Sequence, residues 1–440
     1  MTRRWLLALG TLLMTVAVTP AGAEPRERTF ANGLHVLMDP DPQAAGVDVA
    51  VWYSAGLADE PAGRTGLTHL MERLMFRGSP RFGDGEYARR MGRLGATFNT
   101  FLAPDFTAFY ATAPTQALGT LLELEADRMS GQRLTAANVA AETRALREEQ
   151  RRLEENPLTR ALHQLYVTAF GAHPYANPIQ GRPADRARLT PAALTEYARS
   201  RYGSGNALVT VVGKFDPVEA ESLLARSFGA VARRDPAARL AVADPPDGTR
   251  RGFARLPLRM VLVGWRAPAD SVAGAELAVL AHLLGSGPRA RLAAELTQRQ
   301  RLAFNVSCAY DGRRRASLFY ATAALAPTAD SAAAERALIE QVERFAREPL
   351  TEAELTAARK ALLLAARIER NGVRGRAQAL GAAHLTAGHW SHADRRLERL
   401  AALTAEDIRT VAARVLTAER RSVVWTAPAG LAAAKQGARP

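Results

Sequence analysis

The sequence predicts an α+β protein made of two tandem homologous domains. The clearest reason is a repeat: Phe109–Ala113 reads Phe-Tyr-Ala-Thr-Ala, and the same five residues return at Phe319–Ala323. Shorter matches keep the same order in both halves: Phe98–Asn99 and Phe304–Asn305 before each copy, and Leu189–Thr190 and Leu403–Thr404 near each end. A period of about 200 residues is far longer than that of solenoid repeats and fits whole domains.

Each half follows the same order of elements, which is strands, then long helices, then a closing strand. In the first half, residues 46–56 alternate as in a buried strand and residues 65–76 have helical spacing. The other elements expected there are two strands within 97–113, helices over 115–129 and 135–154, and a closing strand at 208–212. The second half repeats the series with a strand at 260–265, helices from Gly274 and Arg289, two strands within 304–325, helices to about Thr386, and a last strand at 421–425.

The domain boundaries follow from composition. Residues 236–250 carry Pro236, Pro245, Pro246 and Gly248 and predict a linker between the halves. We therefore expect an N-terminal domain over 24–235 and a homologous C-terminal domain over 251–440.

Residues 1–23 predict a cleavable signal peptide. The basic pair Arg3–Arg4 precedes an apolar run, Trp5–Val18, and Ala21–Ala23 forms the small-residue end that a signal peptidase recognises. The arginine pair weakly resembles a twin-arginine signal, so the export route stays open. No later stretch approaches the roughly 18 apolar residues of a membrane span. We expect the mature chain in the periplasm of a Gram-negative cell, without a transmembrane segment.

The net charge of +14 comes from 58 basic and 44 acidic residues. Almost all the basic residues are arginine, since Lys214, Lys360 and Lys435 are the only lysines. Apart from the triplet Arg313–Arg315 they are scattered near acidic residues, which argues against a nucleic-acid-binding stripe. Cys308 is the single cysteine, so no intrachain disulfide can form and we expect it to be buried.

The candidate chemistry lies on the first predicted helix. His69, Glu72 and Arg73 occupy positions i, i+3 and i+4, so they share one helical face. With a histidine at position 73 the motif would be H-x-x-E-H, in which two imidazoles hold zinc and the carboxylate acts as general base. Glu142 and Glu149 lie on the later long helix.

This arrangement resembles the insulinase/pitrilysin family of zinc metallopeptidases, whose inverted H-x-x-E-H motif is completed by a glutamate on a later helix. Segments 66–69, 75–79, 94–99 and 171–175 resemble family motifs around the cleft, and the resemblance covers nearly the whole mature chain. It implies an insulinase-like, LuxS-type metallohydrolase fold, in which each domain is a mainly antiparallel sheet packed by helices. It also implies zinc as the family's cofactor.

The same resemblance assigns roles residue by residue. His69 takes the place of the first zinc ligand, Glu72 that of the general base and Glu149 that of the third ligand, while Arg73 stands where the second histidine belongs. A guanidinium keeps its proton and offers no lone pair to a metal. The metal set is therefore incomplete and Glu72 a vestigial base. We expect Arg73 to replace the charge of the metal by pairing with Glu149, with Glu72 as a second candidate.

Two further positions also depart from the family's pattern. Active members carry an Arg and a Tyr in the second domain that reach the substrate and the transition-state oxyanion, and here Thr297 and Phe304 stand in their places. Loss of oxyanion donors costs roughly 10²–10³ in rate. If the cleft takes an extended peptide, the strand near Asn99 would supply backbone hydrogen bonds and Asn99 a side-chain contact. An ordinary polar strand residue is the other interpretation of Asn99.

These departures predict a secreted, catalytically impaired homologue of the peptidases. It would act as the non-catalytic partner of an active homologous subunit, in a hetero- or homodimer, or as a peptide-binding protein. The alternative is an active zinc endopeptidase with an altered metal site. That reading needs a substitute ligand among the other histidines: His35, His163, His173, His282, His384, His389 and His392. A third class, an arginine-rich surface that binds nucleic acid or lipid headgroups, is disfavoured by the scattered charges.

Overall fold

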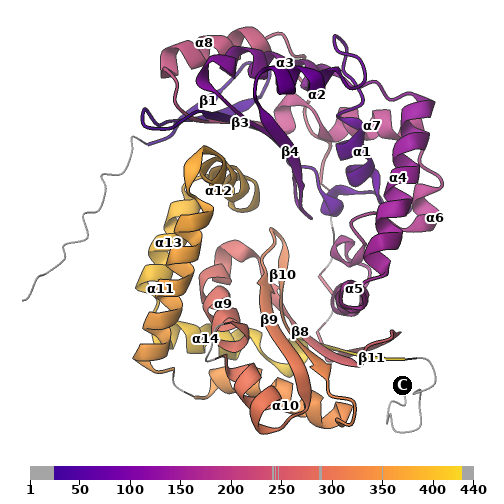
Figure 1. Ribbon diagram of the computed structural model, residues 1–440, viewed down its shortest axis with the longest axis vertical. Helices are drawn as coiled ribbons and strands as arrows, with labels where there is room; N and C mark the ends of the chain where they lie inside the picture. The colour runs from indigo at the N-terminus through magenta and orange to yellow at the C-terminus, as the bar shows by residue number, and fades with distance from the viewer. Residues whose placement is uncertain are drawn as a thin grey trace, which may run out of the picture.

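The computed structural model describes residues 24–239, 242, 244–245, 247–286, 290–348 and 350–428. The predicted signal peptide, residues 1–23, lies outside the described residues. The chain forms two α+β halves, drawn one above the other in Figure 1, and the predicted fold class is confirmed.

The first half contains one sheet and the helices that pack on it. Its strands are β1 (Arg26–Thr29), β2 (His35–Pro40), β3 (Val47–Tyr53), β4 (Thr97–Leu102), β5 (Thr107–Ala113) and β6 (Ala207–Gly213). Its helices are α1 (Leu67–Leu74), α2 (Glu86–Arg93), α3 (Leu118–Ser130), α4 (Ala136–Glu154), α5 (Pro157–Phe170), α6 (Pro183–Arg186), α7 (Pro191–Arg201) and α8 (Pro217–Phe228).

The second half is built in the same way. Its strands are β7 (Arg250–Arg255), β8 (Met260–Pro268), β9 (Ala303–Asp311), β10 (Ala316–Leu325) and β11 (Arg421–Ala427). Its helices are α9 (Asp270–Gly285), a π-helical stretch (Ala293–Arg299), α10 (Ser331–Glu343), α11 (Glu352–Glu369), α12 (Gly372–Ala387), α13 (His392–Ala402) and α14 (Ala405–Val415).

The order of strands in the two sheets explains the sequence repeat. The first sheet runs β1-β2-β6-β3-β5-β4 and the second β7-β11-β8-β10-β9. The repeated pentapeptide lies on β5 and on β10, each of which pairs with a central strand on one side and the edge strand on the other. Within the described strands, β2–β6 and β7–β11 pair parallel and the other pairs are antiparallel, so both sheets are mainly antiparallel as expected.

A few elements differ from the sequence-based expectation. Helix α9 contains the helix predicted from Gly274 but begins earlier, at Asp270, and its backbone leaves helical geometry at Ala273. Residues 287–289, where another helix was expected to begin, lie outside the described residues. Helix α13 was not predicted, although Ala393, Leu397, Leu400 and Ala401 have helical spacing; of its residues only Leu400 is buried. Cys308 is buried as expected.

Each half covers the sheet of the other half with one helix. Helix α5 packs Leu165 against Leu262 of the second sheet, and α12 packs Leu380 against Trp52 of the first. Where α12 crosses the first sheet, a Cβ at Gly381 would lie 2.2 Å from the ring of Trp52, so only glycine allows this approach. In Figure 1, α5 lies above the second sheet and α12 below the first. The two halves therefore share apolar cores and form one unit.

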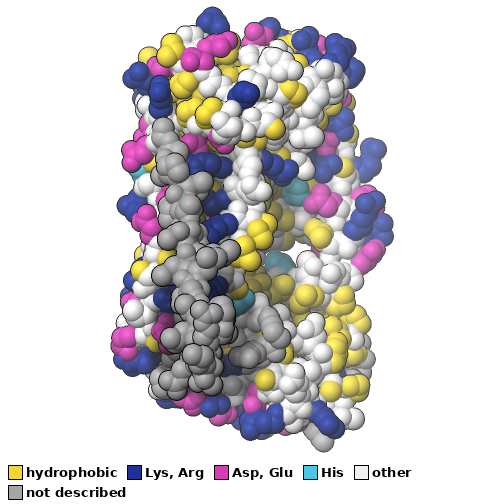
Figure 2. All heavy atoms as spheres, turned by 60° about the vertical axis from the view of Figure 1, so that its left-hand side comes forward, with side chains coloured by type: hydrophobic (Ala, Val, Ile, Leu, Met, Phe, Trp, Pro, Cys, Tyr) yellow, Lys and Arg dark blue, Asp and Glu magenta, His cyan; other side chains and the backbone are white. Residues whose placement is uncertain are grey.

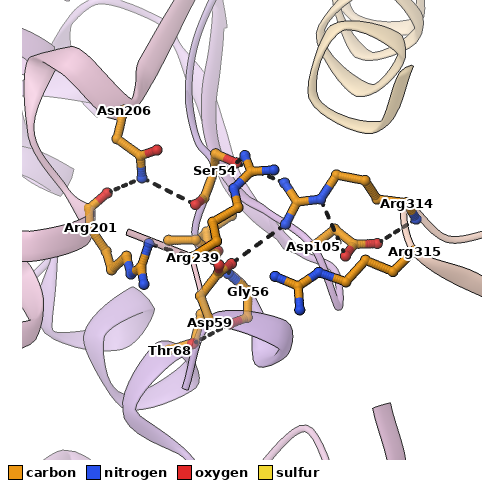
Figure 3. A network of polar contacts seen from close by, with 12 residues as sticks. Ser54, Gly56, Asp59, Thr68, Asp105, Arg201, Asn206, Arg239, Arg314 and Arg315 are labelled. Carbon is orange, nitrogen blue, oxygen red and sulfur yellow. Dashed lines mark hydrogen bonds and ion pairs between the residues drawn. The ribbon is translucent and has the colours of Figure 1, made fainter. Parts of the chain in front are cut away.

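Charged contacts add to this junction, as Figure 3 shows. Arg314, from the turn between β9 and β10, donates from Nη1 to Ser54 Oγ and from its backbone N to Asp105 Oδ2, both over 2.9 Å. Its guanidinium also lies 3.8 Å from the carboxylates of Asp59 and Asp105. Arg239, in the predicted linker, donates to Ser54 Oγ over 2.7 Å. The arginine triplet of the sequence is thus part of the contact between the halves.

The outer surface carries charges of both signs. Figure 2 shows basic and acidic side chains mixed over both halves on the face in view. Among the described residues, none of the helices has both the length and the apolar character that crossing a membrane requires.

The buried carboxylate of Asp48 on β3 predicts how the stability of the fold depends on pH. Burial raises the pKa of Asp48 to about 6, although Thr112 Oγ1 donates to its Oδ2 over 2.7 Å and Arg374 on α12 favours the ionised form. A folded-state pKa above the unfolded value means that ionisation weakens the fold as pH rises from about 4 to about 6, and the full cost persists above that. The difference between the pKa of Asp48 in the folded and the unfolded state corresponds to roughly 3 kcal/mol of stability.

We expect Asp48→Asn to raise the free energy of unfolding at pH 7.5 by about 1–3 kcal/mol and to have little effect near pH 4. Urea denaturation at the two pH values measures this. A variant that is destabilised equally at both would show that the carboxylate contributes through its hydrogen bond instead.

Candidate functional site

Helix α1 is held at its start by backbone contacts that fix the direction of the functional face. Gly66 precedes the helix with φ 95°, a conformation that favours glycine. The buried carboxylate of Glu60 accepts from the backbone N–H groups of Gly66 and Thr68, over 3.0 and 2.8 Å. A Cβ at Gly181 would lie 2.3 Å from the carbonyl oxygen of Thr65, so this loop packs closely against the helix start.

The structure brings three of the predicted residues together between α1 and α4. His69 Nε2 lies 3.8 Å from Glu72 Oε2 on the same helix and 3.6 Å from Glu149 Oε1 on α4. Thr100 on β4 donates its hydroxyl to Glu72 Oε1. The imidazole and the two carboxylates therefore converge, as the helical spacing predicts.

Arg73 occupies the remaining side of this cluster. Its Nε donates to Glu142 Oε2 over 2.6 Å, and its Nη1 donates to Glu149 Oε2 over 3.4 Å. Arg77, one turn later, donates from Nε to the other oxygen of Glu142 over 2.6 Å. The expected pairing with Glu149 is present, but the main partner of Arg73 is Glu142, and the carboxylate of Glu72 bonds to Thr100 instead.

Burial governs the protonation of the cluster. It lowers the pKa of His69, an effect that the nearby Arg73 charge reinforces and the Glu149 carboxylate opposes. It raises the pKa of Glu72, with the hydrogen bond from Thr100 acting in the opposite direction. Both shifts favour the neutral forms of these two groups.

The residues do not fit a catalytic zinc ion. Zinc needs three protein ligands with lone pairs, and the guanidinium of Arg73 adds a positive charge directly beside Glu149. A zinc-bound histidine normally donates its second ring N–H to an acceptor, whereas His69 Nδ1 is enclosed without a partner among the described residues. Nor do the described residues include a group of three His, Cys, Asp or Glu side chains arranged to hold a metal ion.

The other predicted positions lie apart from this cluster. Asn99 is exposed on β4, the edge strand of the first sheet, and the alternation of a strand turns it to the opposite face from Thr100. Thr297 and Phe304 belong to the second half. The hydroxyl of Thr297 is enclosed without a partner among the described residues, and Phe304 is 58% exposed on β9.

Sequence reasoning missed the roles of Thr100, Glu142 and Arg77. Glu142 is the one buried carboxylate of α4 and accepts from two arginines. Its spacing from Glu149, two helical turns, was the available signal, because it puts both carboxylates on the face toward α1. No local signal marks Thr100, since only the tertiary fold brings β4 to α1.

Comparison with known proteins agrees with this fold. The family described as Insulinase (Peptidase family M16) matches residues 35–182, and the Peptidase M16 inactive domain matches residues 188–362. A protein of Mycobacterium tuberculosis named as an uncharacterized zinc protease is 28% identical over 414 residues, which cover 90% of this chain and 92% of that protein.

Solved structures show the same architecture. A protease from Helicobacter pylori superposes with a TM-score of 0.85 at 24% identity, over 92% of this chain and 99% of that one. A peptidase M16 inactive domain from Pseudomonas fluorescens gives 0.82 at 18% identity, over 92% and 98%.

The fold and these similarities thus define a peptidase homologue of the two-domain α+β class. The chain belongs to the insulinase family, peptidase family M16.

Proposed function

We propose that this chain is a secreted, catalytically impaired member of the family, with domains over 24–235 and 251–440, that works in the periplasm without its own zinc chemistry. The observation that carries the proposal is the guanidinium of Arg73, which bonds to Glu142 and Glu149 where a second histidine ligand would stand. Those carboxylates have a permanent cation as their partner, so the cluster is stable without a metal.

The remaining activity that the geometry supports is peptide binding. Strand β4 lies at the edge of the first sheet, where an extended peptide can pair with its outward-facing backbone groups. The amide of Thr100 donates to Asn99 Oδ1 over 2.9 Å, so a bound peptide would take over this hydrogen bond and leave Asn99 as a side-chain contact. Beside α4, a pocket of about 780 Å³ is lined by apolar side chains, among them Leu153, Leu162, Val167 and Ile179. Its size suits one or two large apolar side chains of a bound peptide.

The same reasoning supports a partner subunit. A chain that keeps the fold but lacks a metal ligand, and has Thr297 and Phe304 in the second half, can hold a peptide for an active homologous subunit to cleave. In a heterodimer the partner would supply the complete zinc site. A peptide-binding protein that works alone is the other form of the proposal.

The experiment uses the purified mature chain. We expect less than about a tenth of an equivalent of zinc after dialysis, no cleavage of a fluorogenic peptide library, and saturable binding of unstructured peptides by fluorescence anisotropy. Glu72→Gln serves as the control for cleavage by contaminants, since it removes the candidate base and should change nothing. One equivalent of zinc that is lost in Glu149→Ala, together with cleavage that Glu72→Gln abolishes, would support the alternative of an active zinc endopeptidase and refute the proposal.

A further inference from the structure

A second concave site lies on the side of α4 that faces α6 and α7, away from Glu142 and Glu149. It is a groove of about 440 Å³ between α4 and the segment 186–191, which includes the start of α7. In Figure 1 these helices lie together at the right of the first half. Three arginines line it, Arg144 and Arg147 from α4 and Arg186 from the end of α6, and no carboxylate is among the described side chains that line it.

Two of the charges in this groove, those of Arg144 and Arg147, are not paired with an acid among the described residues. Arg144 and Arg147 are exposed, and within the described residues neither guanidinium has a hydrogen bond or an ion pair, although ion pairs are common for arginine elsewhere in this chain. The nearest acid in sequence, Glu148, is bound by Arg151 over 3.1 Å. Like charges at i and i+3 weaken a helix slightly unless an anion lies between them.

Arg186 forms the rigid wall of the groove. It is 4% exposed, its Nη1 donates to the carbonyl oxygens of Gln180 and Gly181 over 2.6 and 2.7 Å, and its Nη2 donates to Gln150 Oε1. Its Nε is enclosed without an acceptor among the described residues. The hydrogen bonds hold this guanidinium in place, so a positive charge is fixed at the groove before any ligand arrives.

Two neutral features suit the same kind of ligand. The hydroxyls of Thr143 and Thr190 also line the groove. Thr190 is the N-cap of α7, an eleven-residue helix, so the positive end of that helix dipole points to this region.

We propose that this groove binds a small phosphate-bearing anion, which the exposed guanidinium groups of Arg144 and Arg147 contact and the fixed charge of Arg186 attracts. Three arginines, with no carboxylate among the described side chains that line the groove, match a polyvalent oxyanion better than a single peptide carboxylate. The site is separate from the Arg73 cluster and does not depend on the proposed function. The phosphate comes either from a soluble molecule or from a lipid headgroup, and these two sources need different probes.

The test compares the mature protein with Arg144→Gln/Arg147→Gln. Calorimetric titration with inorganic pyrophosphate at low ionic strength should show one saturable site in the wild type and at least a tenfold weaker affinity in the double variant. Arg186 is left unchanged because its hydrogen bonds support the loop at Gly181. The matched control is Arg409→Gln/Arg414→Gln, which removes the same charge from exposed positions of α14 and should bind like the wild type.

Phosphatidylcholine vesicles with and without phosphatidic acid form the second arm. Sedimentation that requires phosphatidic acid and is lost in the Arg144/Arg147 variant would assign the site to lipid phosphate, whereas pyrophosphate binding alone would assign it to a soluble ligand. Absence of binding in both arms, or equal weakening in the α14 control, would overturn the proposal.

Discussion

Arg73→His is expected to take up about one zinc per chain and still to lack measurable peptidase turnover. The substitution places a second imidazole one turn after His69, with Glu149 Oε1 already 3.6 Å from His69 Nε2, and so supplies the third lone pair. Arg77 keeps its 2.6 Å hydrogen bond to Glu142, so that carboxylate is not left unpaired. Zinc content after dialysis and cleavage of a fluorogenic peptide measure the two effects.

Turnover should stay low because the second half is unchanged. By the family resemblance, Thr297 lacks the charge and Phe304 the hydroxyl that would stabilise a developing oxyanion, and one such donor is worth roughly 10²–10³ in rate. We therefore expect Arg73→His/Thr297→Arg/Phe304→Tyr to exceed the single variant by at least about 10²-fold. The control, Arg73→Gln, removes the charge without adding a ligand and should bind no zinc. Equal turnover of the single and triple variants would show that these positions are unimportant.

Arg128→Met is expected to lower the free energy of unfolding by about 3–5 kcal/mol. Arg128 is 3% exposed and donates from Nη2 to the carboxylate of Glu125, which also accepts from Tyr87 Oη over 2.6 Å. Its guanidinium lies 4.3 Å from the ring centroid of Phe109 and 5.2 Å from that of Phe76. Methionine fills similar space but leaves the Glu125 carboxylate buried without a cation. Urea denaturation at pH 7.5 measures the loss.

Two further variants separate the charge effect from packing. Arg151→Met removes an exposed arginine with surface ion pairs and should cost less than about 1 kcal/mol. Arg128→Met/Glu125→Gln removes both charges, so it should recover most of the stability that Arg128→Met loses. A double variant as unstable as the single one would place the effect in the lost contacts with the aromatic rings.

The repeat and the periodicities were sufficient to predict most of the fold. The alternating segment 46–56 contains β3, and the segment 135–154 with helical spacing contains α4. The repeated pentapeptide occupies equivalent strands of the two sheets. These signals are local, so they survive in a single sequence. The exchange of α5 and α12 between the halves is not local, because an apolar helical face does not specify which sheet it covers.

The candidate site, like the fold, was predicted from the sequence only in part. The spacing of His69, Glu72 and Arg73 put them on one face, and the charge of Arg73 was enough to expect an acidic partner. The actual partner, Glu142, and the hydrogen bond from Thr100 to Glu72 depend on how α4 and β4 pack against α1. Glu72, the additional partner expected beside Glu149, has no hydrogen bond with Arg73 among the described residues, and its carboxylate accepts from Thr100 on β4.

The sequence by itself determined that this protein has two related α+β halves and that His69, Glu72 and the permanently charged Arg73 share one helical face, because repeats, periodicity and residue chemistry are properties of the chain. Only the tertiary structure decided that Arg73 pairs mainly with Glu142 and which helices join the halves. It alone also brought Arg144, Arg147 and Arg186 to one groove. Those outcomes depend on distances between residues far apart in the chain, and folding sets such distances through packing and burial.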